Sequence, residues 1–292
     1  MLTIFHQKNI KKCKSLPNFK GDIFKSSNPQ ILKLNLHYHR FGSGPRILLA
    51  IHGFADRGEL FFKLRDVLEE NFTVIAVDLP FHGLTSWEAH EFNPEQLRDE
   101  FLDIFEKEGI YGSFSIMGHS MGGRVVLAMS DFFEDRIDSY IMLAPAGFQG
   151  TQSDSRIFFP KFIRRLLKGL TAWPAFIISI FKGGKFLGII NKGTYRFLEQ
   201  QIAIPERRHR LFDCWISLYD FPIRLKAFKE RVIRTKAKLC FFYGTKDFIT
   251  PAKYGRHFIA DMPNAKIFMV EDGHYFLKEP LVEALKEAKE FY

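Results

Sequence analysis

The stretch Phe114-Ser115-Ile116-Met117-Gly118-His119-Ser120-Met121-Gly122-Gly123 decides the fold of this 292-residue chain. A short apolar run leads into the pattern Gly-x-Ser-x-Gly, and a helical pattern follows over residues 124–133. A sharp turn from strand to helix projects a serine hydroxyl from the backbone at the cost of local strain. The first turn of the helix would stabilise negative charge beside that hydroxyl. Ser120 is therefore the candidate nucleophile; the alternative is a glycine-rich packing turn.

Short apolar runs alternate with amphipathic patterns on both sides of this turn. This alternation is typical of parallel strands joined by crossover helices, and brief apolar strands are expected where both faces of a sheet are covered. We predict strands at residues 31–38, 46–51, 73–77, 114–117, 140–143, 238–243 and 266–270, and further helices at 60–69, 94–108 and 281–291. The fold class is α/β, with a mostly parallel, doubly wound sheet of about eight strands.

One interval interrupts the alternation. Residues 148–225 show no clear strand, mix apolar with basic residues, and contain thirteen Lys and Arg against five Asp and Glu. Residues 1–30 are basic as well. We expect an N-terminal basic arm at 1–30, an α/β core at 31–147 and 226–292, and a helical insertion at 148–225. The net charge of +9 then belongs to the arm and the insertion.

Composition excludes several classes of protein. The hydrophobic fraction of 46% and charged fraction of 26% are those of a folded globular chain. Cys13, Cys214 and Cys240 show neither a zinc-site pairing nor a disulfide framework. We find neither an export signal nor an apolar run long enough to span a membrane. We expect a cytoplasmic protein without a metal or cofactor, and no nucleic-acid partner, because no binding module accompanies the basic residues.

Four separated motifs occur in a characteristic order. They are Ile-His-Gly-Phe at 51–54, Asp-Leu-Pro-Phe-His-Gly at 78–83, the glycine-rich run at 118–123, and an Asp and a His near the end. With these motifs the chain resembles the α/β-hydrolase superfamily, in particular its small esterase-like branch (α/β hydrolase fold-1). The resemblance covers nearly all of the chain except the arm and the insertion. It implies that the insertion is a cap, which excludes water and supplies the substrate pocket.

A serine nucleophile needs a base, and the base needs an acid to orient it. Among ten histidines, His274 is the best candidate for the base because it follows the last predicted strand; an exposed loop histidine is the alternative. Asp247 follows the preceding strand and is the predicted acid, which gives the order Ser, Asp, His expected of this fold. Asp272 is too close to His274 in sequence to orient it easily, and Asp261 begins a turn.

The remaining histidines and the oxyanion hole complete the predicted site. In the resembling fold, backbone N–H groups of Phe54 and Met121 would stabilise the oxyanion. His52 and His82 are expected to organise loops by hydrogen bonding, while His119 points away from the reaction centre. His37 and His39 share one face of a strand, but we expect an exposed pair and no metal site, because no carboxylate or cysteine completes it.

The insertion offers residues for specificity. We take Trp173, Phe176 and Ile177 as substrate-pocket residues among the apolar positions Leu166, Leu167, Leu170, Trp173, Phe176, Ile177, Ile178 and Phe181. Packing of the insertion onto the core is an equal alternative. A second group of residues in the insertion is basic. These residues could contact an anionic membrane peripherally or attract an acidic substrate. They are Arg164, Arg165, Lys168, Lys182 and Lys185.

The leading hypothesis is a serine hydrolase that cleaves a small-molecule carboxylic ester or thioester with an apolar acyl or alkyl group. Carbon–carbon bond hydrolases and cofactor-free haloperoxidases of the same fold are alternatives. The former are disfavoured because His119 and Tyr275 stand where that branch commonly carries Asn and Trp. A slow-turnover ligand-binding or signalling protein is the alternative from another class. The oligomeric state is left open.

Overall fold

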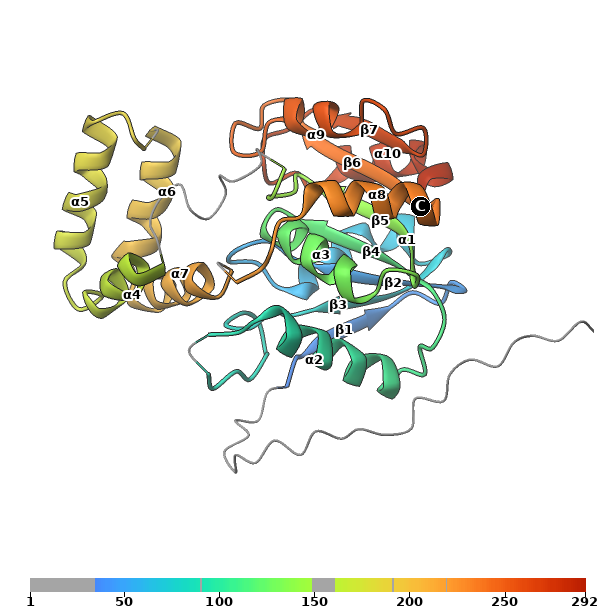
Figure 1. Cartoon of the computed structure of the whole chain (residues 1–292), viewed down its shortest axis with the longest axis horizontal. Helices are drawn as coiled ribbons and strands as arrows, with labels where there is room; N and C mark the ends of the chain where they lie inside the picture. The colour runs from blue at the N-terminus through green and yellow to red at the C-terminus, as the bar shows by residue number, and fades with distance from the viewer. Residues whose placement is uncertain (1–34, 90, 149–160, 191, 219) are drawn as a thin grey trace, which may run out of the picture. The chain divides into compact units, whose positions relative to one another are not determined.

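A seven-stranded sheet forms the centre of the described part of the chain (Figure 1). The computed structural model describes residues 35–89, 91–148, 161–190, 192–218 and 220–292, so the predicted arm at 1–30 lies outside it. The strand order is β1-β3-β2-β4-β5-β6-β7. β1 runs antiparallel to β3, and the other neighbouring pairs are parallel. The loops that follow the parallel strands therefore meet at one edge of the sheet.

The strands agree closely with the apolar runs of the sequence. They are β1 Tyr38–Phe41, β2 Arg46–Ile51, β3 Phe72–Val77, β4 Phe114–His119, β5 Ile137–Leu143, β6 Lys238–Gly244 and β7 Ala265–Val270. The predicted α/β class with a mostly parallel sheet is confirmed. The first strand differs from the prediction for 31–38, because Asn35 forms only an isolated bridge with Ser86 and β1 begins at Tyr38.

Helices cover both faces of the sheet. They are η1 Gly58–Leu64, α1 Arg65–Leu68, α2 Pro94–Lys107, α3 Met121–Phe132, α4 Lys161–Gly169, α5 Pro174–Phe186, α6 Lys192–Ala203, α7 Pro205–Leu218, α8 Leu225–Thr235, α9 Ala252–Ile259, α10 Glu279–Glu287 and η2 Lys289–Phe291. One apolar cluster joins the sheet to α2, α3, α8 and α9, and a second joins it to η1, α1 and α10. Strand β3 contributes Val74 to the second and Ile75 to the first, because successive side chains point to opposite faces.

Local sequence explains where two of the helices begin. Asn93 accepts a hydrogen bond from the Gln96 N–H at 2.8 Å, and the Gln96 side chain accepts one from the Asn93 N–H at 3.1 Å, which closes a capping box before α2. The helix predicted at 60–69 is instead divided into η1 and α1. The first of these helices, η1, begins at Gly58, where a larger residue would not fit because a Cβ atom would overlap the carbonyl oxygen of Ala76.

Four helices, α4 to α7, form the described part of the helical insertion. They enclose an apolar cluster of their own, made of Ile177, Phe181, Ile190, Tyr195, Leu198, Ile202, Leu211 and Phe212. Their contacts with the core include a hydrogen bond from the Phe92 N–H to Ser217 Oγ at 3.0 Å and an ion pair of Arg165 with Glu91 at 2.8 Å. No helix in the described ranges is long and apolar enough to cross a membrane.

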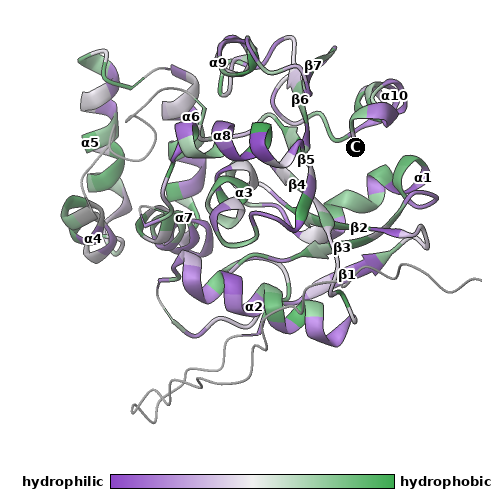
Figure 2. Cartoon of the chain, turned by 45° about the vertical axis from the view of Figure 1, so that its right-hand side comes forward, coloured by the Kyte–Doolittle hydropathy of each residue, from purple (hydrophilic) through white to green (hydrophobic). Residues whose placement is uncertain are grey.

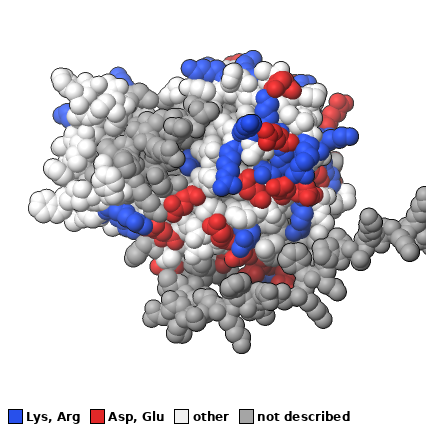
Figure 3. Space-filling view, viewed as in Figure 1, with Lys and Arg blue, Asp and Glu red and all other residues white. Residues whose placement is uncertain are grey.

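Polarity differs between the insertion and the core. Figure 2 shows hydrophobic colour along much of α5 and at the turn after it. Figure 3 shows basic and acidic side chains mixed over the core in that view, while the outermost part of the insertion shows basic side chains without acidic ones. The insertion therefore exposes apolar and basic groups together.

Candidate active site

Ser120 lies on the turn between β4 and α3. Its backbone angles, φ 49° and ψ −113°, fall in a region that L-residues rarely adopt. The turn needs glycine on both sides, because a Cβ atom on Gly118 would lie 2.7 Å from the carbonyl oxygen of Gly122, and one on Gly122 would overlap that of Ile51. The sequence thus folds locally so that the serine side chain projects from the sheet edge.

The structure brings the three predicted triad residues together. His274 Nε2 lies 2.8 Å from Ser120 Oγ, and His274 Nδ1 lies 2.7 Å from Asp247 Oδ2. Asp247 follows β6 and His274 follows β7, so the sheet edge positions both next to the serine from β4. His274 and Asp247 are buried. One hydrogen-bonded chain therefore runs from a hydroxyl through an imidazole to a carboxylate.

The carboxylate of Asp247 is held in its charged form. Burial raises its pKa, but the hydrogen bonds from His274 and Thr250 outweigh burial and leave the pKa below its ordinary value. The N–H groups of Ile249 and Thr250 donate to Asp247 Oδ1 at 2.7 and 3.0 Å, and the Thr250 hydroxyl lies 2.7 Å from Oδ2. We did not predict Thr250 from the sequence. The spacing Asp-x-x-Thr, typical of side chains that close a turn, is the signal that could have found it.

The two acids that we disfavoured are engaged elsewhere. Asp272 accepts a hydrogen bond from the Gly273 N–H at 2.7 Å and pairs with Lys278 at 3.0 Å. Asp261 pairs with Lys229. Both are therefore surface turn residues, and Asp247 is the acid that contacts His274.

The two predicted oxyanion donors come from segments next to Ser120. Met121 is the first residue of α3, so its N–H group has no acceptor within the helix. Phe54 follows Gly53, whose position is close enough to the nucleophile that a Cβ atom there would lie 3.3 Å from Ser120 Cβ. The role of these two N–H groups stays a prediction, and their position in the chain supports it.

Two buried histidines organise the loops around the site, as predicted. His52 Nδ1 donates to the Gly53 carbonyl at 2.7 Å, and its Nε2 accepts from the Leu79 N–H at 3.0 Å. His82 donates to Pro80 and accepts from the Ala55 N–H at 3.2 Å. Burial lowers the pKa of His52 to about 4 and that of His82 well below its ordinary value. Both rings are therefore neutral near pH 7, as their accepting nitrogens require.

One expectation about histidines is wrong. We expected no carboxylate near His37 and His39, but Asp78 Oδ2 lies 3.1 Å from His37 Nδ1 and 3.7 Å from His39 Nε2. The pairing of β1 with β3 brings them together, because Asp78 directly follows β3. The Asp78 carboxylate also accepts N–H bonds from Gly58 at 2.7 Å and Leu84 at 2.8 Å, so it holds two loops at the sheet edge.

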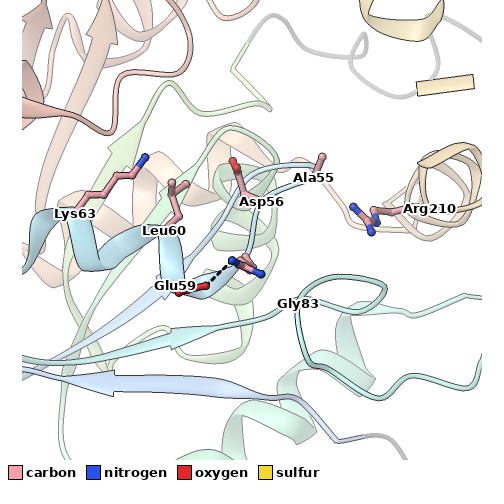
Figure 4. A pocket seen from close by; sticks show the side chains of 8 residues that line it. Ala55, Asp56, Glu59, Leu60, Lys63, Gly83 and Arg210 are labelled. Carbon is pink, nitrogen blue, oxygen red and sulfur yellow. Dashed lines mark ion pairs between the residues drawn. The ribbon is translucent and has the colours of Figure 1, made fainter. Parts of the chain in front are cut away.

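A polar cavity of about 570 Å³ lies beside the loop that follows β2 (Figure 4). This loop contains Phe54 and is termed the predicted oxyanion loop. Its lining comes from the loops after β2 and β3, η1 and helix α7: Ala55, Asp56, Arg57, Glu59, Leu60, Lys63, Gly83 and Arg210. Arg57 pairs with Glu59 at 2.7 Å. Asp56 Oδ2 lies 3.7 Å from Nδ1 of buried His119, so a residue that lines the cavity lies next to the residue before Ser120.

The predicted pocket residues do not line this cavity. Ile177 is buried inside the insertion's own cluster, and Trp173 and Phe176 are exposed. Phe197 of α6 instead reaches the oxyanion loop, with its ring centroid 5.8 Å from that of Phe54. Neither Phe197 nor Arg210 was predicted. Nothing in the local pattern of α6 or α7 distinguishes these positions, because the packing of the insertion on the core decides which residues face the site.

Comparison with known proteins agrees with this fold. The family model of the alpha/beta hydrolase fold matches residues 46–182. The solved structure of a thermophilic esterase from Thermogutta terrifontis superposes with a TM-score of 0.66 at 18% identity, covering 88% of this chain and 93% of that one. The chain therefore has the α/β-hydrolase fold, as the motif order predicted.

Among the curated relatives that also match by sequence are the following two. The acetyltransferase component of the acetoin cleaving system of Cupriavidus necator is 33% identical over 116 residues, which are 39% of this chain and 30% of that protein. An uncharacterised protein of Mycobacterium tuberculosis is 25% identical over 248 residues, which are 80% of this chain and 71% of that protein. This chain thus spans under a third of the first relative's length.

Proposed function

We propose that the protein is a serine hydrolase that cleaves a carboxylic ester or thioester. The hydrogen-bonded chain Ser120–His274–Asp247 carries this proposal, because it provides a nucleophile, a base and an orienting carboxylate in contact. The strained backbone of Ser120 at the start of α3 supports it. The likeness in fold to a structure described as an esterase supports the same class of reaction.

In the proposed mechanism, Ser120 Oγ attacks the substrate carbonyl carbon while His274 Nε2 takes the hydroxyl proton. Asp247 stabilises the resulting imidazolium through the bond to Nδ1. The N–H groups of Phe54 and Met121 stabilise the tetrahedral oxyanion. The intermediate then expels the alcohol or thiol, which receives the proton from His274 and leaves an acyl-enzyme. Water, deprotonated by His274, attacks the acyl carbonyl, and Ser120 regains its proton as the acid departs.

The surroundings of Ser120 divide into an apolar and a polar part. Phe54 and Phe197 supply aromatic surface next to the predicted oxyanion loop, which suits an apolar acyl or alkyl group. The adjoining cavity contains Lys63 and Arg210, which suit a polar or anionic group on the other side of the ester. We therefore propose an amphiphilic ester as the substrate class.

Labelling with a fluorophosphonate probe tests the nucleophile. Wild-type protein should be labelled and Ser120→Ala should not, with equal thermal unfolding of the two proteins as the control for folding. A panel of aryl esters of increasing acyl length then tests turnover. Release of many equivalents of product per protein supports a hydrolase, whereas release that stops at one equivalent would favour a slow-turnover binding protein.

A further inference from the structure

The turn that joins α5 to α6 exposes three large apolar side chains. Phe186 is 91% exposed, Leu187 70% and Ile189 63%. Gly188 between them has a φ of 72°, where the chain reverses direction. The turn lies at the end of the α5–α6 pair (Figure 1) and is coloured hydrophobic in Figure 2. Adjacent apolar side chains exposed to this extent mark an interaction surface.

The charged residues that flank this turn in the sequence all have one sign. Between Ser155 and Leu198 the chain has nine Lys and Arg and no Asp or Glu. Exposed Lys182 and Lys185 precede the turn on α5, and exposed Lys192 and Arg196 follow it on α6. Figure 3 shows the same absence of acidic side chains on the outermost part of the insertion that faces the viewer. The occupant of this surface must therefore combine apolar and anionic groups.

We propose that the α5–α6 turn inserts into the surface of a membrane that contains anionic lipids. Phe186, Leu187 and Ile189 enter the boundary between headgroups and acyl chains, and the flanking Lys and Arg side chains contact lipid phosphates. An apolar insertion combined with several cations gives stable peripheral attachment, whereas one of these signals alone is weak. The proposal does not depend on the chemistry at Ser120.

The charge of the surface disfavours a second copy of the chain as the occupant. A two-fold interface brings the same patch of both copies together. Lys182, Lys185 and Lys192 would then approach their own counterparts, and residues 155–198 offer no acidic partner to compensate. Lipid phosphates supply the opposite charge at a density that suits several cations at once.

Co-sedimentation of the full chain with lipid vesicles tests this attachment. Vesicles of phosphatidylcholine alone are compared with vesicles that also contain phosphatidylglycerol, at low and at high salt. We expect the protein to bind the mixed vesicles at low salt. Binding to phosphatidylcholine alone, or to the mixed vesicles at high salt, should be about ten-fold or more weaker. A Phe186→Trp variant should show tryptophan quenching by brominated acyl chains, which reports insertion rather than surface contact.

Three variants separate the contributions of the apolar and the basic side chains to vesicle binding. Replacement of Phe186, Leu187 and Ile189 by Ser should weaken binding to mixed vesicles about ten-fold or more. Lys182→Gln with Lys185→Gln should weaken binding to mixed vesicles and leave binding to phosphatidylcholine unchanged. The matched control replaces three exposed apolar residues of the core by Ser and should bind like wild type: Leu102, Tyr111 and Ile233. Equal thermal unfolding of all variants excludes loss of the fold.

Three outcomes would overturn the proposal. The first is wild-type protein that does not bind mixed vesicles more tightly than phosphatidylcholine. The second is a core control that loses as much binding as the turn variant. The third is a wild-type dimer in light scattering that becomes monomeric in the turn variant, because a second copy would then occupy the surface.

Discussion

The hydroxyl of Thr250 lies 2.7 Å from the Asp247 carboxylate, on the same oxygen that contacts His274. The same hydroxyl lies 3.2 Å from His274 Nδ1 and 3.1 Å from the carbonyl oxygen of Ala144. Because a hydroxyl has one proton, Thr250 can donate to only one of its acceptors at a time. Thr250 thus contacts both Asp247 and His274, and we interpret it as a positioning residue for Asp247.

Thr250→Val should lower kcat/KM about ten-fold for an aryl ester, because a buried donor worth about 1–2 kcal/mol is lost from Asp247. Without this donor the pKa of Asp247 rises, because one of the hydrogen bonds that stabilise its charged form is lost. Thr250→Ser keeps the hydroxyl and is the control. If the Val and Ser variants lose activity equally, Thr250 does not act through its hydroxyl.

Ser120→Ala and Ser120→Gly should both lose activity, by about 1000-fold or more. They should differ in stability. Glycine tolerates the positive φ of 49° at this position, so Ser120→Gly should have a free energy of unfolding about 1 kcal/mol higher than Ser120→Ala. Urea unfolding of the two inactive variants measures the difference. Equal stabilities would show that the turn is not strained.

Gly122→Ala should destabilise the protein by about 3 kcal/mol, because the added methyl group overlaps the carbonyl oxygen of Ile51 on the neighbouring strand. Gly112→Ala is the matched control, since nothing lies within 4 Å of a Cβ atom there. Its unfolding free energy should change by less than about 0.5 kcal/mol. Similar losses in both variants would contradict the close approach of strand β2 to the turn.

Stability should fall as the pH drops from about 6.5 to about 4. The pKa of His52 is lowered from 6.5 to about 4 in the fold, so between these values the unfolded chain binds a proton that the folded chain does not. The loss from His52 is on the order of 3 kcal/mol. Asp78 and Asp247, whose pKa values lie below 3.8, lose their contributions only at lower pH.

Urea unfolding over this pH range measures the effect. In His52→Gln, which has no titrating ring, the slope of stability against pH should be smaller than in wild type. His209→Gln changes an exposed histidine of α7 and should keep the wild-type slope. A His52→Gln slope equal to that of wild type would show that His52 is not held neutral by burial.

Arg210→Gln should raise KM about ten-fold for an ester that carries a carboxylate, with little change for a neutral ester of the same size. The cationic side chain lines the cavity beside the predicted oxyanion loop, so its loss removes attraction for an anion without touching Ser120. Lys168→Gln is the control, because Lys168 pairs with Asp213 within the insertion. An equal KM change for both esters would assign Arg210 a structural role.

The sequence predicts the candidate catalytic residues better than the residues that would contact the substrate. Ser120, Asp247 and His274 each follow an apolar strand of a parallel sheet, and the carboxyl ends of such strands meet at one edge. Their meeting could therefore be foreseen from order alone. Thr250 could not be chosen in the same way, because its role depends on how the turn after β6 folds back on Asp247.

Other contacts depend on pairing and packing that no local pattern encodes. His37 meets Asp78 only because β1 pairs antiparallel with β3, and the sequence does not say which strand is its neighbour. Phe197 faces Phe54 because the insertion packs in one orientation on the core. A single amphipathic helix pattern gives a buried face, but it does not identify the partner of that face.

The insertion has an interior of its own, whereas all three predicted triad residues come from loops of the sheet. The proposed membrane attachment and the proposed ester cleavage thus depend on different stretches of the chain. Substitutions at the α5–α6 turn should therefore change where the protein binds without altering Ser120, Asp247 or His274.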